Sequence, residues 1–231
     1  MLFPWVGLLE QVRLADVFVH YDDAQFSKGS FVNRVQIKTP QGVRWMTAPL
    51  QNLRLGQRIC EVQLASTPWA DQHLELLAHS FEGAPHASDA LALAESVYRM
   101  PHRHLGELAR ESLLALCRYF GLDRSTRFVD VQSLRIGGAG SRRVLDVVRR
   151  LGGSVYVTGH GAARYLEHEL FESEQVQVAY MNYRREPYPQ LHGAFTPYVS
   201  SLDLVANCGR DGLRHICSDT VSWKEFVHDP A

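Results

Sequence analysis

The stretch Asp16–Phe26, with the sequence DVFVHYDDAQF, decides the fold class of this chain. Its apolar, β-branched and aromatic centre, Val17–Tyr21, predicts a buried strand. Two adjacent carboxylates, Asp22 and Asp23, follow that strand directly. Because ligands of open α/β sheets sit beyond the carboxyl ends of the strands, this strand end is a candidate site. The competing interpretation is a solvated acidic turn between two strands.

Helical and extended patterns alternate on both sides of this strand. Before the middle of the chain, the predicted elements are a helix from Trp5 to about Ala15, a hairpin Val35–Thr47 turning at Thr39–Gly42, a half-buried strand Ile59–Leu64 and a helix from Thr67 to about Glu82. Further along, they are helices within Ala87–Phe120 broken near Pro101 and stopped by Gly121, a strand Phe128–Leu134, a helix Arg142–Leu151, strands Val155–Thr158 and Val176–Tyr180, a short helix from Ala162, a helix from Ser201 and a docked tail Trp223–Ala231. The alternation predicts an α/β fold with a mostly parallel, open, Rossmann-like sheet, an antiparallel hairpin insertion and a helical middle segment. We expect a single domain over residues 1–231, with a helical subregion at 66–121.

Composition excludes several classes of function. A formal net charge of −1 gives no electrostatic basis for binding nucleic acid or an anionic membrane nonspecifically. No apolar run approaches the roughly 18 residues of a membrane span. Met1–Trp5 has neither the basic start nor the apolar centre of a signal peptide. Four widely spaced cysteines without a C-x-x-C pair predict reduced thiols in a cytoplasmic protein, and no metal or cofactor is expected.

The first candidate group contains five polar residues: Asp22, Asp23, Gln25, Asn33 and Arg34. Adjacent strand residues point to opposite faces, so we expect one aspartate to face a cleft and the other to pair elsewhere, for example with Arg34. A carboxylate beside an amide suits holding sugar hydroxyls or an amine, or acting as a general base. The structural alternative is a carboxylate–arginine pair that pins the hairpin.

A second group, Thr158, Gly159, His160 and Gly161, follows the predicted strand Val155–Thr158. Glycines there permit close approach of a ligand, a helix start offers amide donors to an anion, and His160 can move a proton near neutral pH. A surface histidine in a tight turn is the alternative. The segment Gly137–Arg143 matches no complete phosphate-binding motif, so a flexible turn that caps a helix is the favoured interpretation.

The remaining candidates are Tyr188, Gln190, Ser200 and Asp203. Ser200 and Asp203 have capping-box spacing, with Asp in place of the usual Glu or Gln, so helix capping explains them adequately. Tyr188 and Gln190 belong to a proline-spaced loop that we expect to line the same cleft.

Several motifs, in this order along the chain, resemble the WbqC-like family of bacterial proteins: Phe3–Gly7, Ala15–Val19 with Asp22–Phe26, Asn33-Arg34 with Lys38–Gly42, Val155–Leu166, Tyr188–Gln190, Phe195–Pro197, Ser200–Leu204 and Asn207–Gly209. The resemblance covers nearly the whole chain and adds Trp5 and Tyr165 to the expected substrate-binding residues. Family members usually begin with an apolar strand that ends in a histidine-glutamine-proline step. This chain starts inside that region, at Met1-Leu2-Phe3, without such a segment. The expectation is that either the gene start is truncated or this variant has lost part of the site.

The resemblance implies a role in O-antigen or other surface-polysaccharide biosynthesis. The leading hypothesis is a transferase that moves an acyl or aminoacyl group to a sugar amine, with Asp22 or Asp23 as base and Asn33 with Arg34 orienting the donor. Its expected partners are an aminosugar or nucleotide-linked sugar and an acyl donor. A nucleotide-dependent transferase and a non-catalytic binding or assembly protein of the same pathway are the alternatives. The sequence does not decide the oligomeric state.

Overall fold

The structure is a computed structural model and describes residues 1–228. Its N-terminal part contains α1 (Val6–Arg13), β1 (Val17–His20), β2 (Arg34–Thr39), β3 (Gly42–Thr47), β4 (Leu50–Gln51), η1 (Ile59–Glu61) and β5 (Gln63–Leu64). The helical middle contains α2 (Trp69–Ser80), α3 (Ala87–Tyr98), α4 (Leu105–Phe120) and η2 (Leu122–Arg124). The rest contains β6 (Arg127–Asp130), η3 (Val131–Leu134), α5 (Gly140–Arg150), β7 (Val155–Thr158), η4 (His160–Arg164), α6 (His168–Ser173), β8 (Gln177–Asn182), α7 (Ser201–Cys208), η5 (Gly209–His215), β9 (Asp219–Ser222) and α8 (Trp223–His228). These elements confirm the α/β class and the helical middle segment.

The parallel strands form two pairs rather than the one open sheet expected from the sequence. β1 pairs with β6, and β7 pairs with β8, which also carries β9 in the antiparallel direction. Within residues 1–228 no strand joins these two sheets. All four residues of β1 are only half-buried, whereas strands inside a parallel sheet are normally covered on both faces.

The hairpin of β2 and β3 forms with Thr39 opposite Gly42, as the turn signal predicted. The expected strand at Ile59–Leu64 is wrong for its first half, which is the 3-10 turn η1. There, the backbone N–H groups of Ile59 and Cys60 donate to the carbonyl oxygens of Ala24 and Asp22. The loop after β1 therefore uses the hydrogen bonds that a strand partner would need.

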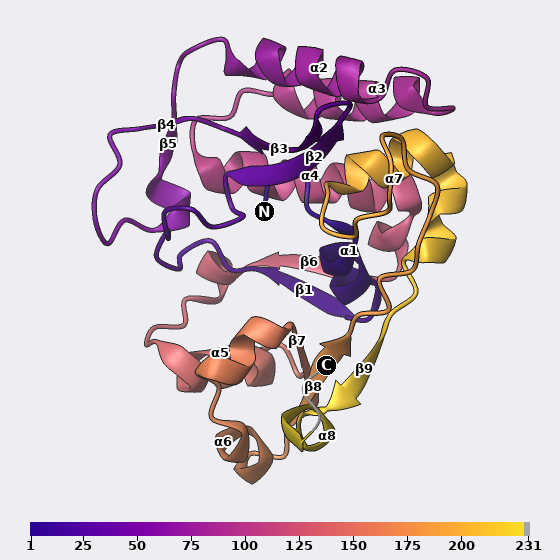
Figure 1. Cartoon of the computed structure of the whole chain (residues 1–231). Coiled ribbons are helices and arrows are strands. Elements are labelled where there is room, and N and C mark those ends of the chain that lie inside the picture. Colours follow the sequence, from indigo (N-terminus) through magenta and orange to yellow (C-terminus); the bar gives the residue numbers. More distant parts are fainter. Residues whose placement is uncertain (229–231) are drawn as a thin grey trace.

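Two hydrophobic clusters lie on either side of the β1–β6 pair (Figure 1). The larger cluster joins α1, the hairpin, α2 to α4 and α7, and its members include Leu9, Ile37 and Leu108. The smaller cluster lies among α5, α6, β8 and α8 and includes Leu145, Phe171 and Tyr180. The segment after β1 runs between them, so its side chains can reach helices of both halves.

Candidate functional site

The carboxyl ends of β1 and β6 meet because the two strands are parallel and in register. His20, the last residue of β1, lies opposite Asp130, the last residue of β6. Asp22 and Asp23 follow β1 within three residues. Three carboxylates therefore gather at one strand end, which is the position favoured for ligand sites in α/β folds.

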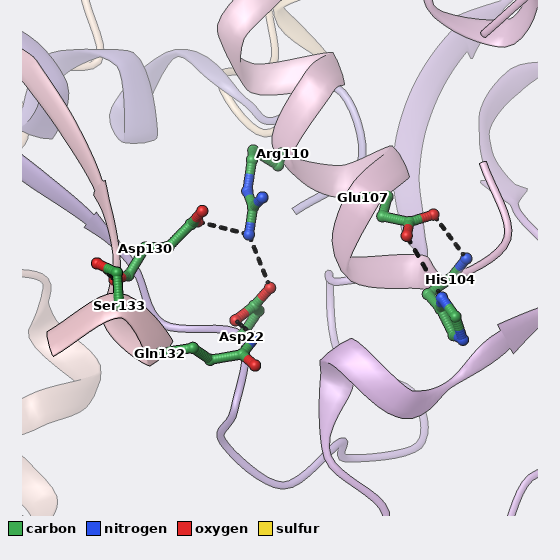
Figure 2. A network of polar contacts seen from close by, with 7 residues as sticks. All are labelled: Asp22, His104, Glu107, Arg110, Asp130, Gln132 and Ser133. Carbon is green, nitrogen blue, oxygen red and sulfur yellow. Dashed lines mark hydrogen bonds and ion pairs between the residues drawn. The ribbon is translucent and has the colours of Figure 1, made fainter. Parts of the chain in front are cut away.

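One arginine of α4 holds two of these carboxylates (Figure 2). Nη2 of Arg110 lies 3.0 Å from Oδ2 of Asp22 and 2.5 Å from Oδ1 of Asp130. Gln132 donates through Nε2 to the other oxygen of Asp22 at 3.0 Å. The side chain of Asp22 is 12% exposed and that of Asp130 is 41% exposed, so Asp130 is the carboxylate open to a ligand. We call His20, Asp22, Arg110, Asp130 and Gln132 the strand-end cluster.

Asp23 points away from this cluster toward α5. Arg143 binds both oxygens of Asp23, at 3.0 Å from Nη1 and 2.5 Å from Nη2, and its guanidinium lies 4.9 Å from the centre of the Tyr21 ring. The two aspartates therefore diverge, as expected, although both lie in the turn after β1 rather than in the strand. The partner of Asp23 is Arg143, so the predicted pairing with Arg34 is wrong.

His20 is uncharged at neutral pH. Burial, reinforced by the nearby Arg110, lowers the pKa of its imidazole to about 4. The ring stacks on Phe128 at 5.7 Å, and its buried Nε2 has no hydrogen-bond partner within the described residues. The cluster thus contains a neutral imidazole beside an arginine and two carboxylates.

The other members of the first candidate group hold the loop and the hairpin. The buried side chain of Asn33 donates through Nδ2 to the carbonyl oxygen of Ala48 at 3.0 Å. Arg34 lies 4.2 Å from the Trp45 ring and donates to the carbonyl oxygen of Gly29. Gln25 is exposed and forms a backbone bridge to Arg58. Within residues 1–228, no side-chain hydrogen bond or ion pair joins these three residues to the strand-end cluster.

The second group has a mainly structural setting. His160 Nε2 lies 2.6 Å from the carbonyl oxygen of Met181, and its ring packs between Tyr183 and Phe226. Thr158 is buried, while Gly161 and Tyr165 are exposed. The helix after Gly159 is the five-residue 3-10 turn η4, which is too short to offer the amide donors of an α-helix start.

Arg142 and Arg143, which follow the glycines at 137–140, are both engaged by carboxylates. Arg143 binds Asp23, and Arg142 contacts Asp146 at 3.3 Å and Glu174 at 3.5 Å. These pairings do not favour a phosphate site, but the helix-capping part of the interpretation is wrong, because Ala139 is the N-cap of α5 and no side chain of the described residues caps it.

Tyr188, Gln190, Ser200 and Asp203 belong to a buried polar network around α7. Ser200 caps the helix by accepting from the backbone N–H of Leu202 at 3.2 Å, but Asp203 completes no capping box. Burial raises the pKa of Asp203 to about 6, and its buried Oδ1 has no hydrogen-bond partner among residues 1–228. Nearby, Gln190 accepts from Nζ of the buried Lys38 at 3.1 Å. This network anchors the proline-spaced loop.

Sequence reasoning missed His20, Arg110, Asp130 and Gln132 as site residues, and it considered Arg143 only as part of the glycine-rich segment. The predicted strand Phe128–Leu134 is wrong in its second half, because β6 ends at Asp130 and the 3-10 turn η3 follows. The two arginines lie inside helices 88 and 120 residues from their aspartates, and no local pattern identifies them.

Residues 1–228 contain neither a metal-ligand cluster nor a membrane-spanning helix. No three side chains of His, Cys, Asp or Glu in this range are placed to share a metal ion. None of the helices in the same range combines the length and the apolar character needed to cross a membrane.

Comparison with known proteins gives a family match and one relative. The chain matches the WbqC-like protein family over residues 1–215. The uncharacterized protein Rv1507c of Mycobacterium tuberculosis is 32% identical over 211 residues, which is 90% of each chain. No solved structure matches.

Proposed function

Because this chain belongs to the WbqC-like protein family, we propose that it is an enzyme of bacterial surface-glycan or aminosugar metabolism, with the strand-end cluster as its active site. The proposed reaction is transfer of an acyl or aminoacyl group to a sugar amine. The four free cysteines support a cytoplasmic location for it.

A single observation carries this proposal: Arg110 holds two carboxylates of unequal exposure at the paired strand ends. Both oxygens of Asp22 are occupied, by Arg110 and Gln132, so its role is to orient the guanidinium. The Asp130 side chain is more open, at 41% exposed, and within the described residues its ion pair with Arg110 uses Oδ1 alone. A carboxylate that a substrate can reach, next to a fixed cation, is an arrangement suited to base catalysis.

The proposed roles follow from this geometry. The sugar amine attacks the acyl carbonyl, and Asp130 accepts the proton that the amine loses. Arg110 stabilises the negative charge that develops on the carbonyl oxygen. The carbonyl re-forms as the bond to the donor's leaving group breaks, and the leaving group takes the proton from Asp130.

The test incubates the purified chain with nucleotide-linked aminosugars and acyl donors and follows the products by mass spectrometry. We expect an acylated sugar from the wild-type chain and about 100-fold less from Asp130→Asn, which keeps the shape of the side chain and removes the base. Asp123→Asn changes an exposed carboxylate on η2 and is the matched control.

The alternatives give different results. A nucleotide-dependent transferase would show thermal stabilisation by free nucleotides without an acyl donor. A binding or assembly protein would form no product, and Asp130→Asn would leave cellular glycan production intact. Equal product from the wild-type chain and Asp130→Asn would remove the strand-end cluster from the mechanism.

A further inference from the structure

A small pocket opens at the N-terminal end of α1, apart from the strand-end cluster. Its wall includes Trp5, Glu10, Arg185, Tyr188, Phe195 and His215. Its enclosed space is about the size of one water molecule, and its lining includes exposed residues such as Arg185. The pocket therefore fits one small head group while the rest of a ligand stays outside.

Glu10 supplies this pocket with a negative charge that lacks a cation. The residue is only 2% exposed, yet no Lys, Arg or His side chain within residues 1–228 lies at ion-pair distance from it. Within the described residues its carboxylate accepts one hydrogen bond, from the backbone N–H of Ser218 to Oε1 at 3.3 Å. Buried carboxylates are normally paired, because removing an unpaired charge from water is costly.

Trp5 forms an aromatic side of the same pocket and is held firmly in place. Its ring lies across Gly7, where a Cβ atom would come within 2.2 Å of a ring carbon. Tyr183 and Tyr198 pack on it with ring centres at 5.0 and 5.6 Å. Indole faces attract cations, so Trp5 and Glu10 favour the same kind of ligand.

The buried His215 adds a hydrogen-bond donor. Its Nε2 accepts from Arg214 Nε at 3.2 Å, so Nδ1 carries the proton of the neutral ring. That buried Nδ1 has no partner among the residues described. A ligand with a hydroxyl group next to its cationic group would accept a hydrogen bond from Nδ1–H of His215.

We propose that this pocket binds the protonated primary amine of a small hydroxylated molecule, with the ammonium group between Trp5 and Glu10. An ammonium group is close in size to a water molecule and so matches the enclosed space. A guanidinium or a quaternary ammonium is too large for it. The inference does not depend on the reaction proposed for the strand-end cluster.

The test measures binding of methylammonium, D-glucosamine and N-acetyl-D-glucosamine to the whole chain by NMR, following the indole N–H signal of Trp5. We expect saturable binding of the two amines at millimolar concentrations and none of the acetylated sugar. Glu10→Gln keeps the side-chain shape and its acceptor for the Ser218 N–H but removes the charge. It should weaken amine binding about tenfold or more. Glu75→Gln makes the same charge change on the exposed surface of α2 and should bind as the wild type does.

Thermal unfolding separates this role from a structural one. Removing an uncompensated charge predicts that Glu10→Gln melts no lower than the wild type. A lower melting temperature with unchanged amine binding would make Glu10 a structural residue and overturn the proposal. The proposal would also be overturned if methylammonium failed to bind, or if the two sugars bound equally well. It would be overturned as well if potassium displaced the bound amine as effectively as another amine does. Gly7→Ala, which must displace the Trp5 ring, should weaken binding as Glu10→Gln does.

Discussion

The buried carboxylates of this protein fall into two contrasting sets. At the strand end, Asp22 and Asp23 are half-buried residues, and each is bound by an arginine. On α1 and α7, Glu10 and Asp203 are fully buried residues, and neither has an ion-pair partner within residues 1–228. The most deeply buried charges are therefore the unpaired ones. Paired charges near the surface tie the fold together, whereas unpaired buried carboxylates oppose folding and call for another explanation.

The paired set also connects the two halves of the molecule. Asp22 reaches Arg110 on α4, which belongs to the larger hydrophobic cluster, and Asp23 reaches Arg143 on α5, beside the smaller one. Two neighbouring side chains in the turn after β1 therefore hold both halves. The same contacts can serve stability and catalysis together.

The largest effect is expected from breaking the paired set. Arg110→Met leaves Asp22 and Asp130 close together without their shared cation, and the two like charges repel. We expect a loss of about 3 kcal/mol in the free energy of unfolding, measured by urea denaturation at pH 7. Arg99→Met, which breaks the exposed pair with Glu95, should cost about 0.5 kcal/mol or less. Equal losses in the two variants would show that the strand-end pairing contributes no more than an exposed ion pair.

A smaller effect of opposite sign is expected from the unpaired set. Burial raises the pKa of Asp203 to about 6 from an ordinary value of 3.8, so the folded state releases this proton less readily than the unfolded state. The contribution of Asp203 to the free energy of unfolding is largest below pH 4 and is lost as the pH rises through 6. Asp203→Asn removes that loss and should stabilise the protein by about 2 kcal/mol at pH 8, with little difference at pH 4.

Urea denaturation at the two pH values checks this expectation, with the exposed Asp211→Asn as control. Equal destabilisation by Asp203→Asn at both values would contradict it. In that case, Asp203 would stabilise the fold through a contact that forms whether or not its carboxyl group is protonated, and not through its charge.

The smallest effect concerns the imidazole beside the paired set. The pKa of His20 is lowered to about 4 in the folded state, so the unfolded state binds a proton more readily between pH 6.5 and 4. Its contribution to stability is full above pH 6.5 and is lost as the pH falls toward 4. When the pH is lowered from 7 to 5, the free energy of unfolding of His20→Phe should therefore fall by about 1 kcal/mol less than that of the wild type. His79→Gln, an exposed change on α2, should follow the wild type, and parallel curves for all three proteins would refute the assignment.

Local sequence patterns predicted much of the secondary structure. The helical spacing of Trp5, Leu8 and Val12 marks α1, and the turn at Thr39–Gly42 sets the register of the hairpin. Gly121 ends α4 in the left-handed conformation that glycine adopts readily. These features depend on neighbours in the chain, so the sequence alone reveals them.

Local sequence patterns predicted only part of the candidate site. The expected alternation of strand side chains predicted that Asp22 and Asp23 diverge; they do, but they lie in the turn after β1. Their partners come from helices far along the chain, chosen by how α4 and α5 pack beside the strand ends. No sequence pattern identifies such a long-range pairing. Arg34 was therefore a reasonable prediction for the partner of one aspartate, but the structure does not use it.

What the sequence determined by itself is the α/β class, the hairpin, the helical middle and the polar end of β1, because each follows from local periodicity and turn chemistry. Only the tertiary structure decided which carboxylates find a cation. Charge pairing depends on distance in space, and burial sets its energy. Asp22 and Glu10 carry the same charge, but only packing against α4 gives the first an arginine and leaves the second facing a pocket.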